Sequence, residues 1–494
     1  MKKLTFRCLF GLFMLALGAI AYGQETKLEF KAAGFIDAQT YWFVNTTPGN
    51  PAAGIYDALY SHYKFGGGAL DRKVAYLESR AHLKFDFLMA KELSGTIYFE
   101  MDSGRWGSPD GTKNSFGFWS GDRAALEVKN VYINFGLPYF GIPAPMTVRV
   151  GLQPLYIRGN LLVYTDGMGV VGAIRIDPVD IQPFWFKALE GRDATSDDVD
   201  VYGLQIRANV DKVTIGGYGL YYNMNTYPLN AVSSNYGDGS QEAKMLWLGV
   251  YADGKAGPVN FNVDFIYDTG KVEDPRTPTV PEVKCHGWVT YAKVDYPWEK
   301  YNFGVVGLYA SGADTRKTSS TGLAGTATST GANSKKVESY VVPPGSEAPG
   351  MFSESVVFYG SWVNRSASGI GNGGSQFIIN RGAIGGTWMA KLYGSYKVAP
   401  ELKITFQGLY IGDTTQNGNT VGNAVKSDGT LRDDKSIGLE ADIIAELMIY
   451  KNLKFSAGFG YLWAGDGLDL KRTSTTNVEP KNPWQLTTNL TYVF

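Results

Sequence analysis

Cysteine is almost absent from this chain, which excludes a fold that depends on disulfide bonds. The sequence holds two cysteines in 494 residues. Cys8 lies in an N-terminal leader, so Cys285 is expected to be alone in the mature chain, without an intramolecular partner. Folding must then rest on packing and hydrogen bonds.

Long apolar runs are also missing beyond the N-terminal leader. The best candidate, residues 441–450, is interrupted by Asp442 and Glu446, so no segment suits a membrane-spanning helix. A mean hydropathy of -0.14 with 44% hydrophobic residues is too polar for a helical membrane protein. If the mature chain enters a membrane, we expect it to do so as a closed β-barrel, whose backbone groups are all paired between strands.

Neither an excess of one charge nor a catalytic motif is present. Lys and Arg number 46 against 47 Asp and Glu, and histidines number three. Nucleic acid is therefore not an expected partner, because no basic surface is implied. Cys285 and His286 are neighbours on a predicted strand and point to opposite faces, which argues against a metal pair. We expect no catalytic residue, metal site or cofactor, and hence no enzyme.

The first 23 residues have the form of an export signal. Lys2, Lys3 and Arg7 precede an apolar segment over 9–20, and Ala21 and Gly23 form a small-x-small cleavage site. This order is typical of a secretory signal peptide. The expected division is a signal peptide over 1–23 and a β-barrel over 24–494, with the mature chain starting at Gln24.

Abundant glycine and aromatic residues fit a protein made of strands and turns. The chain has 61 glycines and 31 tyrosines, and apolar and polar residues alternate in repeated segments separated by turn clusters. This pattern predicts about eighteen antiparallel strands, and a count of twenty stays open because 355–363 could extend as a strand. The predicted strands are 27–43, 73–88, 94–102, 126–135, 146–157, 170–176, 181–188, 199–210, 213–223, 245–254, 259–268, 288–296, 301–311, 387–398, 402–411, 436–450, 453–464 and 484–494.

The connections alternate in length, as in bacterial outer-membrane barrels with short periplasmic turns and long extracellular loops. An N-terminus on the periplasmic side places every long loop outside and returns residue 494 to the periplasm. The predicted tight turns are 90–92, 177–180, 211–212, 255–258, 297–300, 399–401 and 451–452, with a longer one near 138–145. The predicted long loops are 45–71, 105–123, 227–243, 271–284, 313–386, 413–435 and 466–483.

The division of each strand into two faces decides between a barrel and a soluble β-sandwich. Along 76–87 the charged residues share one face with His82, and apolar residues take the other. A charge on the lipid face costs about 2–4 kcal/mol at mid-bilayer for Arg or Lys, so the charged face must look into water. A sandwich can show the same alternation in single strands, but the C-terminal strand adds a further signal.

The last strand alternates apolar and aromatic residues and stops at the final residue. Trp484, Leu486, Leu490, Tyr492 and Phe494 share one face. This strand resembles the C-terminal signal by which the barrel-assembly machinery recognises outer-membrane proteins, with Tyr492 and Phe494 as its aromatic positions. The preceding hairpin, 437–466, resembles the final strands of alginate-export-type barrels. These resemblances imply an outer-membrane barrel of a Gram-negative-type bacterium.

A barrel of about eighteen strands leaves an aqueous channel, so the predicted function is that of a diffusion porin for small hydrophilic solutes or ions. Its lumen is expected to carry charges of both signs, Asp37 of the first strand among them, which predicts weak selectivity. The connection 313–386 either folds into the lumen as a constriction or covers the surface. The predicted pore-lining residues are Glu78, Arg80, His82, Lys84, Asp86, Glu100, Arg149, Arg207, Asp264, Lys391, Lys403, Glu440 and Asp442.

The final hairpin also allows a prediction of register. Across the turn at 451–452, Met448 is expected opposite Lys454, which makes Glu446 a diagonal neighbour of Lys454 on the same face. Glu446 is then neutralised locally. Glu440 and Asp442 are expected opposite Leu462 and Gly460, with their charge available to attract cations.

Two other functions stay open at this point. An exporter of an anionic polysaccharide is suggested by the hairpin resemblance and predicts an excess of basic lumen residues. A barrel that only anchors surface loops predicts a plugged pore. The expected partners are outer-membrane lipids, the assembly machinery and small solutes, with a homotrimer as one open arrangement.

Overall fold

The computed structural model describes the strands and part of their connections. The described residues are 27–44, 73–90, 92–102, 106–107, 126–137, 144–191, 196–229, 241–275, 282–317, 336–346, 354–360, 378–471, 474–479 and 481–494. The predicted signal peptide (1–23) with its cleavage site, loop 45–71, most of loop 105–123, and parts of loops 227–243, 271–284, 313–386 and 466–483 and of turns 90–92 and 138–145 lie outside them.

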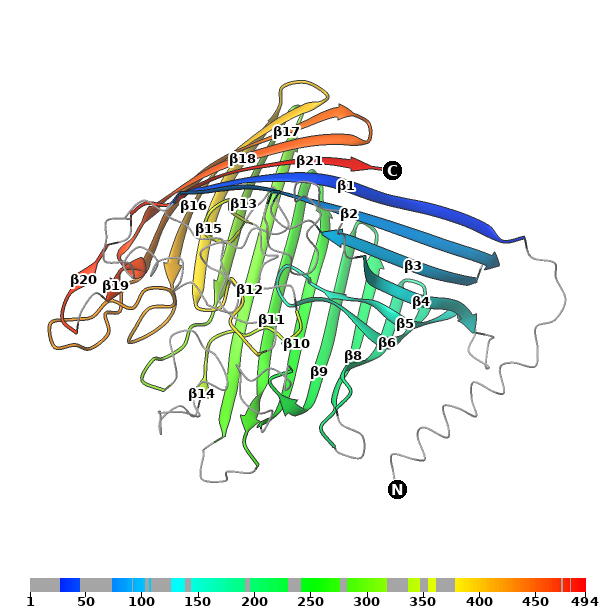
Figure 1. Ribbon diagram of the computed structural model, residues 1–494, viewed down its shortest axis with the longest axis horizontal. Coiled ribbons are helices and arrows are strands. Elements are labelled where there is room, and N and C mark those ends of the chain that lie inside the picture. Colours follow the sequence, from blue (N-terminus) through cyan, green and yellow to red (C-terminus); the bar gives the residue numbers. More distant parts are fainter. Residues whose placement is uncertain are drawn as a thin grey trace.

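The strands form one closed antiparallel barrel, as the alternation predicts. The sheet contains 19 strands, of which β14 (Lys336–Val337) is a two-residue parallel addition to β12, so the barrel wall has eighteen. Figure 1 shows this wall in sequence order, with the blue β1 beside the red β21. The wall strands are β1 (Glu29–Val44), β2 (Lys73–Ala90), β3 (Leu93–Asp102), β4 (Glu127–Leu137), β5 (Met146–Ile157), β6 (Val163–Ile176), β7 (Val179–Leu189), β8 (Val199–Val210), β9 (Val213–Tyr227), β10 (Gln241–Ala256), β11 (Val259–Glu273), β12 (Val283–Trp298), β13 (Tyr301–Ala310), β15 (Thr387–Lys397), β16 (Leu402–Asp413), β17 (Ser436–Tyr450), β18 (Leu453–Ala464) and β21 (Trp484–Val493).

Some observed strands are longer than predicted, and most of the additional residues lie at the strand end farther from the tight turns. The β6 strand begins at Val163 rather than at residue 170, because Gly167 and Gly169 interrupt the alternation but still pair with β5. A Cβ atom at residue 169 would lie 2.6 Å from the ring of Phe186, which explains the glycine there. Residues 354–360 form bends and no strand, so this segment does not add to the wall.

Tight turns close one end of the barrel, called here the turn end; the opposite end is the loop end. Two residues connect β8 to β9, and Asp211, the first of them, has a φ of 53°. Gly257, in the equally short turn before β11, has a φ of 59°. Positive φ at such positions matches the twist of two-residue hairpins. At the loop end, β19 (Leu470–Lys471) and β20 (Asn477–Val478) pair within the last connection, after the short 3₁₀ helix η3 (Asp466–Leu468).

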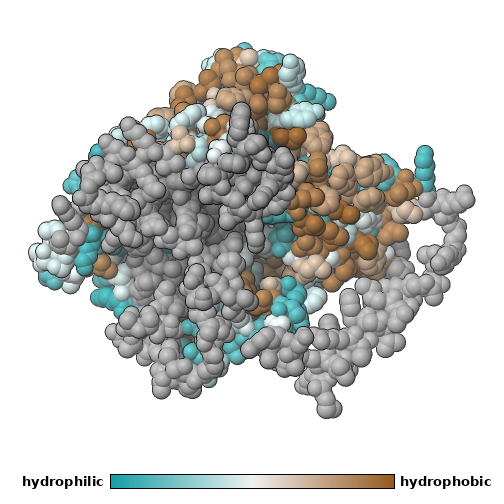
Figure 2. Space-filling view, viewed as in Figure 1, coloured by the Kyte–Doolittle hydropathy of each residue, from teal (hydrophilic) through white to brown (hydrophobic). Residues whose placement is uncertain are grey.

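The outer surface of the wall is apolar and is bordered by aromatic side chains at both ends. Figure 2 shows hydrophobic side chains gathered over β17 and β18 and over the first strands. On β13 the exposed rings of Tyr301 and Tyr309 are eight residues apart, about 27 Å along a strand. Exposed rings near the turn end are Trp298, Tyr301, Tyr396, Tyr450 and Tyr492, and near the loop end Trp42, Tyr156, Tyr202, Tyr309, Tyr410 and Trp463. This belt has the form that outer-membrane barrels present to lipid. No helix among the described residues is long and apolar enough to cross a membrane.

The barrel closes where the C-terminal strand meets the first strand. Ten residues of β21 pair with β1, from Trp484 opposite Val44 to Val493 opposite Phe35. Beyond the strand, the backbone N–H of Gly34 donates to the Phe494 carbonyl at 2.9 Å, and the Phe494 N–H donates to the Gly34 carbonyl at 3.0 Å. The terminal residue thus makes the last two hydrogen bonds of the seam.

Removing Phe494 should therefore impair formation of the barrel. Deletion removes both bonds to Gly34, and Phe494→Ser removes the ring, which packs 5.8 Å from the ring of Tyr492. We expect a severalfold loss of folded protein, measured by heat-modifiable migration in envelope fractions. Phe494→Tyr keeps the ring and should fold as the wild type does. Wild-type amounts of folded Phe494→Ser protein would contradict the assigned role of the terminal ring.

Candidate functional site: the inner face of the barrel

The thirteen predicted pore-lining residues all lie on the inner face of the wall, opposite the exposed apolar side chains. The predicted register of the last hairpin is confirmed, with Met448 opposite Lys454, Glu440 opposite Leu462 and Asp442 opposite Gly460. The Lys454 ammonium lies 2.7 Å from Glu446, which also pairs with Lys403. Periodicity thus gave the face of each residue, but not the groups that cover it.

The inner face is apolar near the loop end of β8 to β13, a feature that the sequence analysis missed. Val201, Leu220 and Trp247 point inward and are fully or almost fully buried. The signal was present in the sequence, because the inward positions of these strands change from charged to apolar residues toward the loop end. Such a wall needs a cover, since water would otherwise contact it.

The cover comes from the long connection between β13 and β15. Its described inner segments 336–346 and 378–386 pack into the same hydrophobic core as the wall. The Trp247 indole N–H donates to the Val341 carbonyl at 2.8 Å, and the Asp268 carboxylate accepts the Val341 N–H at 3.1 Å. At least these parts of 313–386 therefore fold into the lumen, in line with the constriction alternative.

A second piece of chain enters the lumen after β5. Residues 158–162 form a turn that starts at Arg158, whose φ is 44°. The Arg158 guanidinium bonds Asp253 at 2.7 Å, pairs with Asp264 and lies 4.5 Å above the ring of Tyr251. The predicted pore-lining residue Asp264 is therefore covered by Arg158. A lone arginine after a strand carries no recognisable pattern, so the sequence analysis did not find this contact.

The inner segment closest to β15 to β18, residues 354–360, is called here the strap. Its backbone donates hydrogen bonds to two wall carboxylates. Glu440 accepts the N–H groups of Val357 and Phe358 at 2.6 and 3.0 Å, and Asp442 accepts that of Val356 at 3.2 Å. Glu440 is 0% exposed and Asp442 5%. The expectation that these charges face open water is corrected, because the strap covers both.

A buried ion pair holds the start of the strap. Glu354 pairs with Lys391 of β15, whose ammonium also donates to the Glu354 carbonyl at 2.9 Å. The Tyr291 hydroxyl of β12 donates to the Glu354 carboxylate at 2.7 Å. Burial favours a raised pKa at Glu354, but the charges of Lys391 and Lys293 and the hydrogen bonds from Lys391 and Tyr291 together hold the pKa of that carboxyl below its ordinary value. Lys391 is also covered, at 1% exposure.

The inner face of β1 to β3 has a different character and is called here the polar lane. It consists of Asp37, Glu78, Arg80, His82, Lys84, Asp86, Glu100 and Asp102, together with Lys129 of β4. Arg80 pairs with Asp102, and Glu100 lies 2.6 Å from His82 and 3.2 Å from Lys129. Side-chain exposures of 24% for Arg80, 31% for Asp102 and 39% for Lys84 show that water reaches this wall. The adjoining inner face of β21 carries Gln485, Thr487 and Asn489.

Two members of the lane were missed in the sequence analysis. Asp102 shares the face of Glu100 by simple alternation and could have been found. Lys129 could not, because a bulge between β3 and β4 shifts its register, with Tyr98 opposite Asn130 and Phe99 opposite Val128.

The two remaining predicted arginines are held by local contacts. Arg149 bonds Gln153 and lies 5.2 Å from the ring centre of Tyr132. Arg207 shares the Asp180 carboxylate with Arg175, at 2.9 and 3.0 Å.

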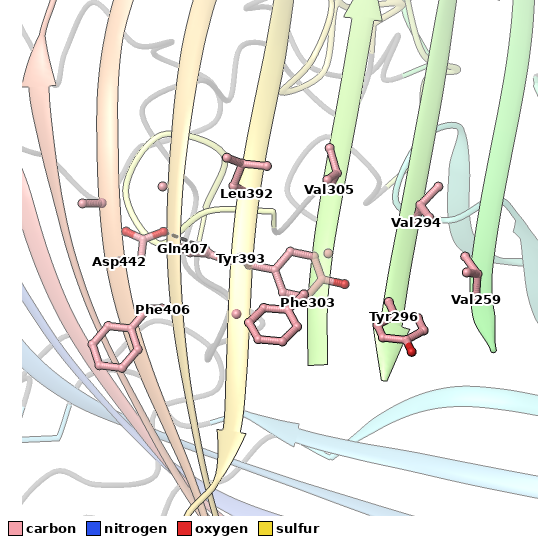
Figure 3. A pocket seen from close by; sticks show the side chains of 14 residues that line it. Val259, Val294, Tyr296, Phe303, Val305, Leu392, Tyr393, Phe406, Gln407 and Asp442 are labelled. Carbon is pink, nitrogen blue, oxygen red and sulfur yellow. Dashed lines mark hydrogen bonds between the residues drawn. The ribbon is translucent and has the colours of Figure 1, made fainter. Parts of the chain in front are cut away.

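One apolar hollow of about 760 Å³ lies on the outside of the barrel and is distinct from the lumen. Figure 3 shows Phe303, Leu392 and Phe406 around it. Its depth arises where Gly408 faces outward, since a Cβ there would meet nothing within 4 Å. The hollow belongs to the lipid-facing belt.

Comparison with solved structures places this architecture among known barrels. No family model matches the chain, and no curated protein matches it in sequence. Pseudomonas aeruginosa OccK8 (OprE) aligns with 94% of this chain and 98% of its own at 11% identity and a TM-score of 0.50. The fold is that of the outer-membrane porins. The outer membrane protein OpdK of the same organism (94% and 99% coverage, 10% identity, TM-score 0.46) and a BenF-like porin from Pseudomonas fluorescens Pf-5 (94% and 98%, 9%, 0.48) are also similar.

The buried pair of this porin fold can be tested through stability. Lys391→Met leaves the Glu354 carboxylate buried without its cation, which should lower the free energy of unfolding by about 3–5 kcal/mol. Adding Glu354→Gln to this variant removes the buried, unpaired carboxylate and should restore most of the lost free energy of unfolding. Denaturant unfolding of the barrel in lipid vesicles, followed by tryptophan fluorescence, measures both variants. As a control, Lys84→Met on the exposed lane should cost about 1 kcal/mol or less. Equal midpoints for Lys391→Met and the double variant would show that the pair does not stabilise the fold.

Proposed function

We propose that the protein is an outer-membrane porin through which small hydrophilic solutes or ions diffuse passively. The observation that carries this proposal is the polar lane, a charged inner wall that water reaches at Arg80, Lys84 and Asp102, within a closed barrel whose outer belt is apolar. A charged inner wall has no role in packing, since charges are costly to remove from water. The fold of the structural neighbours supports the same function.

Weak charge selectivity follows from the composition of the lane. It carries five carboxylates against three cations, with His82 taken as neutral. The carboxylates of Glu100 and Asp102 lie beside Arg80 or Lys129, so much of the charge is compensated within a few ångströms. The summed charge of the lane is nevertheless acidic, which favours cations slightly.

Two alternatives are weaker but distinct. Export of an anionic polysaccharide, which the C-terminal hairpin resemblance suggests, requires an excess of basic residues on the path, and the lane has the opposite balance. A non-transporting scaffold for surface loops draws support from the apolar core that fills the lumen along β8 to β13. The lane is the feature that a pure scaffold does not need.

Location and partners form part of the same proposal. The chain reaches the outer membrane of a Gram-negative-type cell after cleavage of residues 1–23, and the barrel-assembly machinery recognises Tyr492 and Phe494. Outer-membrane lipids contact the aromatic belt. Association as a homotrimer is a further part of the proposal that the lipid-facing wall permits.

The proposal predicts stepwise currents when purified protein is added to a planar lipid bilayer. A scaffold gives no current, and a polysaccharide exporter gives an anion-selective one. Absence of conductance by folded protein would reject the porin function.

Selectivity should depend on the lane carboxylates. Glu100→Gln keeps the hydrogen-bonding shape near His82 but removes one charge, so the reversal potential in a salt gradient should move toward anions. The shift should grow as ionic strength falls, because screening weakens. Asp211→Asn, in a tight turn outside the lane, is the matched control and should leave the potential unchanged. A conducting Glu100→Gln channel with the wild-type potential would remove Glu100 from the path.

A further inference from the structure

The two carboxylates Glu440 and Asp442 serve the backbone of another segment rather than a solute. Between them they accept the N–H groups of three consecutive strap residues, Val356, Val357 and Phe358. Asp442 also accepts the Gln407 side-chain amide of β16 at 2.6 Å, a bond visible in Figure 3. Because carboxylates bind backbone amides whatever the side chains are, this contact fixes the position of the strap on the wall.

The wall is shaped to admit the strap at this point. Gly460 of β18 lies opposite Asp442 in the register. A Cβ atom at residue 460 would lie 2.7 Å from the Val356 Cβ and 2.9 Å from the Val357 Cγ2. The side chains of Val356 and Val357 therefore lie closer to residue 460 than an unshifted side chain there would allow.

Both ends of the strap are attached to other strands. Glu354 is held by Lys391 and Tyr291, as described above. At the other end the Tyr359 hydroxyl lies 3.0 Å from the Thr387 hydroxyl of β15, and the Tyr359 N–H donates to Ser355 at 3.1 Å. The strap is thus the place where the long inner connection is attached to the wall from β15 to β18.

We propose that Glu440 and Asp442 are positioning residues that hold the inward-folded connection on this wall and so set the largest solute that the channel admits. The proposal rests on the porin function proposed above. In this role the two carboxylates limit size through the strap, whereas the polar lane, which begins on the same wall beyond β18 and β21, governs charge. Their burial keeps their own charge away from passing ions.

The variant Glu440→Ala with Asp442→Ala removes all three amide acceptors. Released from the wall, the strap no longer occupies the space along β17 and β18, so single-channel conductance should rise roughly twofold or more. Larger sugars should also enter liposomes in swelling assays. Heat-modifiable migration confirms that the variant is folded.

The matched control is Glu446→Ala on the same strand and the same inner face. Its carboxylate binds Lys403 and Lys454 rather than the strap. This variant should keep the wild-type conductance and size limit. Equal effects of the control and the double variant would overturn the proposal, because they would trace the change to lost charge.

A disulfide lock tests the position of the strap directly. A Cβ atom at residue 460 would lie 2.7 Å from the Val356 Cβ, which is short of the separation of about 3.5–4.5 Å that a disulfide needs. A bond between Val356→Cys and Gly460→Cys therefore requires the strap to move away from β18 by about 1 Å, as its release in the double-alanine background allows. In the double-alanine background, oxidation should return conductance and size limit to wild-type values, and a reductant should raise them again. No response to the redox state, with the disulfide demonstrated on gels, would overturn the proposal.

Hydrogen exchange separates failure of this inference from failure of the porin function. If wild-type protein does not conduct, the porin function fails, but the contact can still be measured in the folded barrel. Amides of Val356, Val357 and Phe358 should exchange slowly in wild-type and Glu446→Ala protein and much faster in the double variant. Equal protection in all three would overturn the assigned role of Glu440 and Asp442.

Discussion

The whole structure depends on pairing the backbone of the first strand with that of the last. A strand edge left open within lipid would expose unpaired N–H and C=O groups, each at a cost of several kcal/mol. The seam between β1 and β21, ending in the two bonds between Gly34 and Phe494, removes this edge. Once the sheet is closed, alternation along each strand sends one set of side chains to lipid and the other to the lumen.

Closure creates an interior that the wall cannot fill with its own side chains. An eighteen-stranded barrel is too wide for that, and much of its inner face near the loop end is apolar. Side chains of the long connection after β13 and of the turn at 158–162 fill this space. Both segments enter as irregular backbone, whose N–H groups need acceptors, and wall residues such as Asp268, Glu440 and Asp442 provide them. Irregular backbone inside the barrel therefore requires buried hydrogen-bond acceptors on the wall, and these carboxylates supply them.

The wall was predictable from the sequence because period two is a local property. Strand number, most strand bounds and the register of the last hairpin follow from alternation and turn residues. The sequence also assigned Glu440 to the correct face. Its burial was not predictable, because the covering amides of Val357 and Phe358 lie some eighty positions away in a connection without periodicity. The inward position of Lys129 was not predicted for a different reason, since one bulge reverses the face of every following residue.

In the proposed porin, the arrangement separates two properties that the inner charges were expected to share. Counting charged inward residues suggested a lumen in which each carboxylate contributes to ion attraction. A carboxylate that accepts buried backbone amides contributes little to the field in the channel, because its charge is taken up by fixed dipoles and kept from water. A carboxylate beside partly exposed cations, such as Glu100 next to Lys129 and Arg80, still contributes. The groups that bind each carboxylate, rather than the face of the strand on which it lies, therefore determine whether it positions the strap or attracts ions into the channel.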